Sequence, residues 1–221
     1  MEARELIAKN VAAQFHDGDL INLGIGIPTL SLKYVDPEIE VFMHGENGSI
    51  GIGGNTKRGE ESFDYNIVDA SGVHAYLNPG AACFDSLQSF ALTRSGHLDA
   101  TVLGAFEVDE EGNLANWAIP GRIYAGMGGA MDLVSGAKKV IVAMEHCNKK
   151  GASKILKRCT LPLTGAGVVS MIITELGIME VTPEGLKLTA LAPGVSVEEI
   201  RAKTEAKLIV PEQIGTMLSD D

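Results

Sequence analysis

A single carboxylate stands where the sequence changes from an apolar stretch to a glycine-rich one. Glu46 opens the run Glu46-Asn47-Gly48, and residues 45–54 contain five glycines. Asn-Gly favours positive φ and a sharp turn, so the run is expected to present the carboxylate at the tip of a turn. The glycines that follow leave backbone N–H groups uncovered, and such groups bind oxyanions or let a ligand approach closely. The alternative is an ordinary surface turn with a solvated glutamate.

A second glycine-rich segment lies earlier in the chain. Gly24 and Gly26 follow an apolar stretch, but Thr29 occupies the place of the third glycine in a G-x-G-x-x-G fingerprint. No acidic partner for a dinucleotide ribose is obvious. A tight turn from strand to helix is therefore the simpler interpretation.

A third segment places a glycine pair at the start of a predicted helix. Gly128 and Gly129 lie in residues 126–132. Free N–H groups at the positive end of a helix suit a developing oxyanion. Close packing of a helix on a sheet would require the same glycines, so both interpretations stay open.

Other common chemistries lack their signatures. The five histidines show no metal-ligand spacing such as H-E-x-x-H. Glu145, His146 and Cys147 are adjacent, but neighbouring residues of a strand point to opposite faces. No G-x-S-x-G elbow is present, which argues against an ordinary serine hydrolase. We expect neither a metal nor a permanently bound cofactor.

Charge restricts the partners of the chain. The formal net charge of the 221 residues is −11, and binding to nucleic acid needs a basic face. An anionic ligand must therefore use local donors or cations, or those of another chain. Lysines do cluster at Lys138-Lys139 and in residues 149–158. A solvated face is the simpler interpretation of these clusters, and a phosphate site is the alternative.

The chain is expected in the cytoplasm. Its first residues lack the basic and apolar regions of a signal peptide, and no apolar run is long enough to span a bilayer. Cys83, Cys147 and Cys159 form no CxxC pair, which fits a reducing compartment. Each is expected to be a small buried apolar side chain.

Strand-like and helix-like patterns alternate along the chain. Helical spacing predicts helices at 4–15, 29–34 (with Thr29 as a possible N-cap), 86–94, 131–134 and 197–203. Apolar runs predict strands at 20–23, 39–43, 100–103, 140–143, 168–174, 178–181, 186–191 and 207–210. This order predicts a single domain, 1–221, with an open α/β fold. Its mainly parallel sheet would be flanked by helices, with some antiparallel strands towards the C-terminus.

Taken together and in order, the motifs resemble the β subunit of the class I (3-oxoacid) CoA-transferases. The segments that carry this resemblance are 22–29, Glu46-Asn47-Gly48, 114–117, 126–134, 144–146 and 159–164. The similarity extends from the first helix to about residue 189 and is nearest to the acetate/acetoacetate (butyrate–acetoacetate) branch. The resemblance implies transfer of CoA from an acyl-CoA or 3-oxoacyl-CoA, such as acetoacetyl-CoA, to acetate, butyrate or another short-chain acid.

The resemblance also implies roles for individual residues. Glu46 matches the nucleophile, which carries CoA as a glutamyl thioester in a ping-pong reaction. Gly129, with Gly128 beside it, matches the backbone that stabilises the glutamyl carbonyl. Asn22 and Asn116 match contacts to the CoA-bearing glutamyl group. The remaining candidates for CoA and substrate binding are Gly24, Gly26, Asn47 and Gly48. Coenzyme A is then both substrate and covalent intermediate.

A partner is implied in the same way. Class I enzymes place the active site between this subunit and a CoA-transferase α subunit, commonly as an α2β2 heterotetramer. The chain departs from the usual family pattern in having Gly45 where many relatives have Ser, and in residues 69–73, where many have Asn-Ala-Gly.

Three alternatives stay open. A CoA-thioester hydrolase would also use Glu46, but would release free CoA without an acceptor acid. A non-catalytic acyl-CoA or sugar-phosphate sensor would need no nucleophile. The chain could also be active as a homomer without an α subunit.

Overall fold

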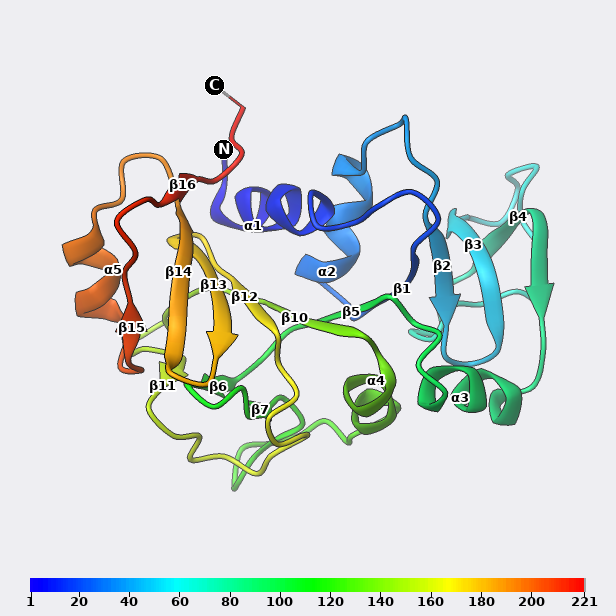
Figure 1. Ribbon diagram of the computed structural model, residues 1–221. Helices are drawn as coiled ribbons and strands as arrows, with labels where there is room; N and C mark the ends of the chain where they lie inside the picture. Colours follow the sequence, from blue (N-terminus) through cyan, green and yellow to red (C-terminus); the bar gives the residue numbers. More distant parts are fainter. Residues whose placement is uncertain (221) are drawn as a thin grey trace.

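Residues 1–220 are described by a computed structural model built around one large mixed sheet (Figure 1). The strands of this sheet are β1 (Leu20–Leu23), β2 (Phe42–Gly45), β3 (Ser49–Asn55), β4 (Ala75–Cys83), β5 (Ala100–Leu103), β10 (Lys139–Ala143), β12 (Met171–Ile173), β13 (Gly177–Thr182), β14 (Gly185–Leu191), β15 (Leu208–Ile209) and β16 (Gly215–Thr216). Their order is β15-β14-β13-β12-β10-β5-β1-β2-β3-β4, and β16 also pairs with β14. Strands β12, β10, β5, β1 and β2 are parallel neighbours. The prediction of an open, mainly parallel sheet is confirmed.

Both ends of this parallel core continue in antiparallel strands. The β12-β13-β14 meander is the antiparallel part expected near the C-terminus. At the other end β2, β3 and β4 are also antiparallel, which the sequence pattern did not indicate. The tip between β2 and β3 is where Glu46 lies.

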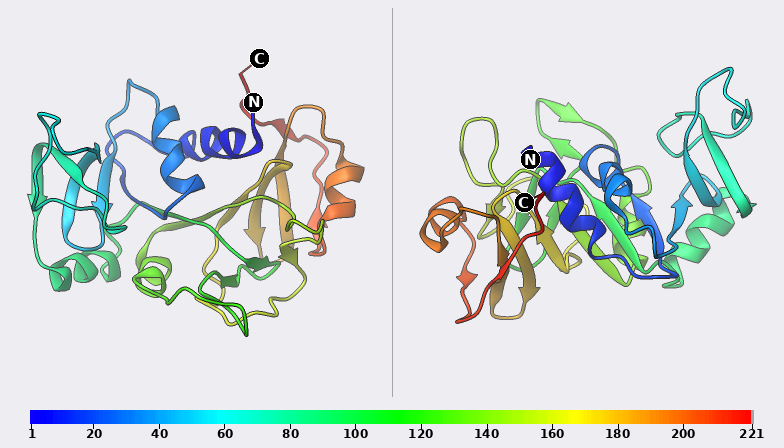
Figure 2. Two further views of the ribbon diagram at one scale, coloured as in Figure 1. Left: turned by 180° about the vertical axis from the view of Figure 1, so that it is seen from behind. Right: turned by 90° about the horizontal axis from the view of Figure 1, so that it is seen from above.

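Helices cover both faces of the sheet. They are α1 (Ala3–Ala12), α2 (Ile27–Leu30), the 3₁₀ helix η1 (Ser31–Tyr34), α3 (Ser86–Arg94), α4 (Ala130–Gly136) and α5 (Val197–Lys203). Helices α1 and α2 pack together on one side of the central strands, and α4 lies on the other, with α3 beside it (Figures 1 and 2). The flanking helices were therefore predicted correctly.

Alternation along the strands divides the apolar core between the two faces. Val140 and Val142 of β10 enter one cluster, whereas Ile141 and Ala143 enter the other. The second cluster also receives the apolar stripe of the first helix, which includes Ile7. Complete burial of an aliphatic side chain such as this contributes about 1.5–3 kcal/mol, so this stripe holds α1 on the sheet.

Short strands form two smaller sheets beyond the parallel core. Strands β6 (Glu107–Asp109), β7 (Leu114–Ala115) and β11 (Ile155–Leu156) make one, and β8 (Ala118–Ile119) pairs with β9 (Ile123–Tyr124) in the other. Asn116 lies between β7 and β8. None of these two- and three-residue strands was predicted, because a run this short carries no readable period.

Three boundaries and one segment differ from expectation. The first helix ends near residue 12 rather than 15, and the strand expected at 39–43 is β2, two residues later. Thr29 is not an N-cap: it lies inside α2, where its Oγ1 accepts from Gly26 N and donates to Gly26 O. Residues 49–54, expected to be a glycine-rich loop, are strand β3, so their backbone groups pair with β4 instead of lying free.

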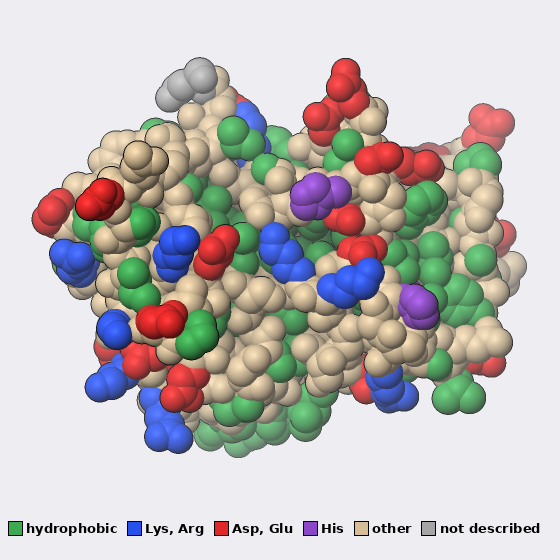
Figure 3. Space-filling model, viewed as in Figure 1, with side chains coloured by type: hydrophobic (Ala, Val, Ile, Leu, Met, Phe, Trp, Pro, Cys, Tyr) green, Lys and Arg blue, Asp and Glu red, His purple; other side chains and the backbone are tan. Residues whose placement is uncertain are grey.

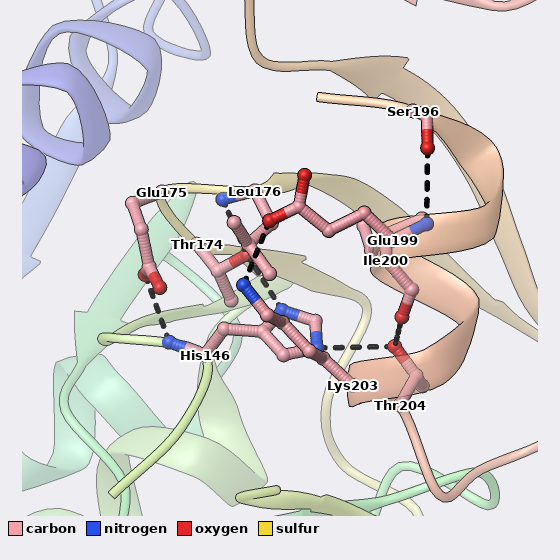
Figure 4. A network of polar contacts seen from close by, with 9 residues as sticks. All are labelled: His146, Thr174, Glu175, Leu176, Ser196, Glu199, Ile200, Lys203 and Thr204. Carbon is pink, nitrogen blue, oxygen red and sulfur yellow. Dashed lines mark hydrogen bonds and ion pairs between the residues drawn. The ribbon is translucent and has the colours of Figure 1, made fainter. Parts of the chain in front are cut away.

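A fully buried histidine fastens α5 to the sheet (Figure 4). His146 Nδ1 lies 3.0 Å from Thr174 Oγ1, and Nε2 lies 3.0 Å from Thr204 Oγ1, just after α5. Thr204 donates onward to the Ile200 carbonyl. A neutral ring, with one donor and one acceptor nitrogen, satisfies both contacts, and burial lowers the pKa of His146 to about 4.

The surface facing the reader in Figure 3 mixes acidic and basic side chains, with acidic groups at the tip of the loop that leads into β2. None of the helices in residues 1–220 has the length and hydrophobicity needed to cross a bilayer. The expectation of buried cysteines is wrong for Cys83, which is exposed at the end of β4, and Cys147 and Cys159 are only partly buried.

Candidate active site

Glu46 lies at the tip of the tight turn that joins β2 to β3. Gly48 N donates to the Gly45 carbonyl at 2.9 Å, closing the turn. Gly48 has φ +126°, and a Cβ there would collide with the Phe84 carbonyl oxygen. Glycine is therefore required at position 48 for both its conformation and its packing. The Asn-Gly signal thus identified the turn correctly.

Two donors from other elements approach the half-buried Glu46 carboxylate. Asn22 Nδ2, on β1, lies 3.5 Å from Glu46 Oε2. Gly129, the N-cap of α4, lies so close that a Cβ on it would stand 2.8 Å from Glu46 Oε1. Burial raises the pKa of Glu46, whereas hydrogen bonding from the Asn22 side chain and the Gly129 backbone lowers it. The site thus combines partial desolvation, which makes a carboxylate more basic, with donors suited to a developing negative charge.

Helix α3 fixes the place of the Gly129 backbone. The Phe90 ring lies against Gly129, where a Cβ would stand 2.9 Å from the ring edge. Arg94 Nε donates to Asp132 Oδ1 on α4 at 2.7 Å, tying the two helices together. Gly128 has φ +51° and open space around it, so its glycine is explained by conformation and not by contact with Glu46.

Two polar side chains behind the turn were missed by sequence reasoning. His44 is 2% exposed, and its Nε2 lies 2.8 Å from Ser89 Oγ on α3. Asn22 Nδ2 donates to the His44 carbonyl at 3.1 Å and lies 3.4 Å from His44 Nδ1. Burial lowers the pKa of His44 to about 4, so the ring is neutral at neutral pH. A histidine two residues before the glutamate was visible in the sequence, but nothing there indicated its contact with Ser89.

Asn116 lies apart from the carboxylate. Its Nδ2 donates to the Gly104 carbonyl at 3.2 Å, and its Oδ1 accepts from Thr164 Oγ1 at 2.6 Å. These contacts fix the carboxamide after β5, and no hydrogen bond joins it to Glu46 within the described residues. Thr164, from the sequence motif at 159–164, is thereby given a structural role.

Gly24 and Gly26 follow β1 at the carboxyl edge of the parallel strands. A Cβ on Gly24 would press on Leu103, so this glycine permits close packing against β5. Gly26, with φ +102°, lines a cavity of about 310 Å³ at the ends of β1, β5 and β10. Arg4 and Lys154 bring cations to this cavity, and Glu145 brings a carboxylate. Ligands of open α/β sheets bind at such an edge, although Glu46 itself does not line this cavity.

A larger cavity, of about 500 Å³, lies elsewhere. Its lining includes Glu110, Glu111 and Glu184, together with parts of β13 and β14. Three carboxylates make it unsuitable for an anionic ester such as CoA. Among the described residues no group of three or more His, Cys, Asp or Glu is arranged to hold a metal ion.

The two departures from the family pattern both lie beside the turn. A Cβ on Gly45 would stand 2.6 Å from Ser49 Oγ, so the serine at 49 fills the space that a side chain at 45 would need. Ser49 Oγ is buried without a hydrogen-bond partner. In the other segment, Asp69 Oδ1 accepts from Ser71 N and Val73 N, and Asn47 Nδ2 donates to the Val68 carbonyl.

The lysine clusters have different environments. Lys138 Nζ pairs with Asp99 Oδ1 at 2.7 Å, and Lys139 Nζ donates to Gln14 Oε1. Lys149, Lys150, Lys157 and Arg158 are exposed. Only Lys154 of that run turns inward, to the cavity at the strand ends, where burial lowers its pKa.

Comparison with known proteins gives a consistent family. Residues 4–203 match the family described as coenzyme A transferase. The beta chain of the acetate CoA-transferase of Haemophilus influenzae is 50% identical over 217 residues, covering 98% of this chain and 96% of that protein. The corresponding chain of the two-subunit succinyl-CoA:3-ketoacid coenzyme A transferase of Helicobacter pylori is 47% identical over 207 residues, covering 94% and 99%.

Solved structures share the fold. The acyl-CoA transferase YdiF of Escherichia coli O157:H7, as apoenzyme, has a TM-score of 0.77 at 22% identity. The match covers 98% of this chain, but the chain spans only 43% of the length of YdiF. A second YdiF structure, described as a thioester complex with CoA, has a TM-score of 0.74 at 21% identity.

Proposed function

The chain belongs to the coenzyme A transferase family, and we propose that it is the β subunit that supplies the reactive carboxylate, Glu46, of a two-subunit CoA-transferase. The observation that carries this proposal is the placement of the carboxylate. It lies at a turn tip, partly desolvated, with Asn22 Nδ2 and the Gly129 backbone directed at it. The names of the two bacterial relatives, each one chain of a CoA-transferase with separate subunits, support the same assignment.

The first half of the reaction loads CoA onto Glu46. A Glu46 carboxylate oxygen attacks the thioester carbonyl carbon of acyl-CoA, the C–S bond breaks, and CoA leaves as a thiolate. The product is a mixed acyl–glutamyl anhydride. The thiolate then attacks the Glu46 carbonyl carbon, and the original acyl group leaves as a free carboxylate. CoA is now held as a glutamyl thioester.

The second half repeats these steps in reverse. The carboxylate of an acceptor acid attacks the glutamyl carbonyl carbon and releases the thiolate. The thiolate attacks the acyl carbonyl of the new anhydride, so a new acyl-CoA leaves and the Glu46 carboxylate returns. A carboxylate is needed at position 46 because this group must first be a nucleophile and then the acyl half of a thioester. The thioester bond energy is conserved, so no ATP is required.

The donors around Glu46 fit the charge that these steps develop. Each attack on the glutamyl carbonyl passes through a tetrahedral oxyanion on that carbon. Asn22 Nδ2 and Gly129 N are placed to stabilise it, and loss of one such donor typically costs about 10²–10³ in rate. The 3.5 Å separation of Asn22 Nδ2 from the resting carboxylate is long, as is common before substrate binds and the site tightens.

The substrates proposed are short-chain acids and their CoA esters. The relatives act, by name, on acetate and on succinyl-CoA with 3-ketoacids. We extend acetoacetyl-CoA as donor and acetate or butyrate as acceptor to this chain on that ground. An anionic ester would meet few cations here, since the net charge is −11. A CoA-transferase α subunit is therefore proposed to provide much of the binding surface.

Exposed apolar side chains beside the glycine pair support a partner at this place. Tyr124, Met127 and Met131 are 69%, 38% and 44% exposed, and they surround the segment that reaches Glu46. Large apolar side chains in one exposed patch mark interaction sites more often than single ones do. An α subunit docked here would also exclude water from the anhydride, which hydrolysis would otherwise waste.

The test is transfer by matched variants of the complex with the α subunit. Glu46→Gln removes the nucleophile with almost no change in shape, and Glu40→Gln makes the same change on the exposed loop before β2. We expect Glu46→Gln to abolish acetyl-CoA formation from acetoacetyl-CoA and acetate, and Glu40→Gln to keep it. Transfer by Glu46→Gln at the wild-type rate would refute the proposal. Release of CoA without an acceptor acid would identify a hydrolase instead.

A further inference from the structure

A chain of buried polar contacts runs from the catalytic turn into helix α3. Asn22 Nδ2 faces three groups: the His44 carbonyl at 3.1 Å, His44 Nδ1 at 3.4 Å and Glu46 Oε2 at 3.5 Å. His44 Nε2 lies 2.8 Å from Ser89 Oγ, and Ser89 Oγ donates to the Gly45 carbonyl at 3.4 Å. Asn22, His44 and Ser89 are each at most 3% exposed. The last contact returns to the residue directly before Glu46.

The contacts determine which way each group points. Ser89 uses its only hydrogen on the Gly45 carbonyl, so its oxygen accepts from His44 Nε2–H. A neutral imidazole protonated at Nε2 has an acceptor at Nδ1. That acceptor faces the Asn22 amide, which must turn its NH₂ group, and not its oxygen, towards His44.

The orientation of the Asn22 amide decides what Glu46 meets. With the amide as described, an N–H donor faces the carboxylate. With the amide reversed, its oxygen would face three acceptors: the His44 carbonyl, His44 Nδ1 and the carboxylate. A reversed amide would also offer no donor to the oxyanion on the glutamyl carbon. Without His44, only the backbone carbonyl would oppose this reversal.

We propose that His44 and Ser89 are a positioning pair that keeps the Asn22 amide aimed at Glu46 and braces the Gly45 carbonyl at the base of the turn. This role rests on the proposed function of Glu46 as the carrier of CoA. Neither residue touches the substrate or the reacting atoms. Both act through Asn22 and the backbone of the turn.

The surroundings leave this pair as the source of the effect. The elements packed around Glu46 (β1, β2, β3, α3 and α4) carry only two formally charged side chains, Arg94 and Asp132. These two pair with each other at 2.7 Å. No charge on these elements is therefore free to orient the Asn22 amide in place of His44.

Variants at position 44 separate the two contacts of the ring. His44→Leu removes both nitrogens. His44→Asn keeps an acceptor near the Nδ1 position but is too short to reach Ser89. Ser89→Ala removes the hydroxyl, and Thr93→Val is its matched control, because Thr93 is also buried on α3 but donates within the helix to the Ser89 carbonyl.

The experiment measures the rate constant for loading CoA onto Glu46 in the complex with the α subunit. Acetoacetyl-CoA is mixed rapidly at several concentrations without acceptor, and the mass of this chain is followed. We expect His44→Leu to lower the maximal loading rate about 10- to 100-fold, with the half-saturating concentration changed less than about 3-fold, since Asn22 orientation matters most in the transition state. His44→Asn should recover part of the rate, Ser89→Ala should be slower than wild type, and Thr93→Val should match wild type.

The outcomes distinguish this proposal from the one it rests on. No adduct in the wild-type complex would refute the function proposed for Glu46. A wild-type adduct with unchanged loading in His44→Leu and Ser89→Ala, per folded molecule by circular dichroism, would refute the positioning role alone. If His44→Leu does not fold, Ser89→Ala and His44→Asn decide the question. Equal slowing by Ser89→Ala and Thr93→Val would indicate a merely structural role and overturn the proposal.

Discussion

The buried histidines make the stability of the fold depend on pH in a direction that can be calculated. His146 has no exposed surface, and burial lowers its pKa from 6.5 to about 4. Between these two values the unfolded chain binds a proton that the folded chain does not. Stability that is complete at pH 7 is therefore lost as the pH falls through this window.

The size of the effect follows from the gap between the two pKa values. At about 1.36 kcal/mol per pH unit, the loss reaches about 3.4 kcal/mol well below pH 4 and about 2 kcal/mol at pH 5, for a folded pKa of about 4. His44 adds a similar amount, because burial lowers its pKa to about 4 as well. This is large beside a typical domain stability of about 5–15 kcal/mol.

Urea denaturation of the full chain at pH 7.5, 6 and 5, with wild type and His146→Gln side by side, measures the effect. Glutamine does not titrate, so the variant should lose about 2 kcal/mol less than wild type between pH 7.5 and pH 5. The carboxylates titrate alike in both proteins and cancel in the comparison. Parallel loss of stability in the two proteins would show that His146 is not held neutral by burial, and the reasoning would fail.

Three further predictions concern the turn and its donors. Gly129→Ala places a methyl group 2.8 Å from the reactive carboxylate oxygen and should slow transfer about 100-fold in a steady-state assay; Gly136→Ala on the same helix should lower the melting temperature but keep the rate per folded molecule. Asn22→Leu removes a hydrogen bond that lowers the carboxyl pKa, so the acidic limb of the kcat/KM profile should move to higher pH, and an unmoved limb would contradict the contact. Gly45→Ser should destabilise the chain by about 1–3 kcal/mol in urea denaturation because it meets Ser49 Oγ, and adding Ser49→Ala should restore part of that loss unless the crowding lies elsewhere.

Features set by local sequence were predictable. The helix Ser86–Arg94 and the strand Ala100–Leu103 were expected at the bounds that the structure gives, because each has a clear period and ends at turn residues. The turn at Glu46-Asn47-Gly48 was predictable for the same reason, since Asn-Gly encodes it locally.

Features set by contacts across the chain were not predictable. Strand β3 contains three glycines and resembles a loop in sequence, and only its pairing with β4 makes it a strand. The contact of His44 with Ser89 joins residues 45 positions apart, so no local pattern could announce it. Asn116 illustrates the converse: the resemblance implied a contact with the glutamyl group, whereas in the structure its carboxamide is held by Gly104 and Thr164.

The central claim is that Glu46 carries CoA, and the mass of the chain tests it most directly. The chain, in complex with its α subunit, is exposed to acetoacetyl-CoA without acceptor and quenched at once. The account predicts an adduct of CoA minus water that maps to Glu46, disappears on addition of acetate and is absent from Glu46→Gln. Turnover of acetoacetyl-CoA with no adduct on this chain, or an adduct on another residue, would contradict it.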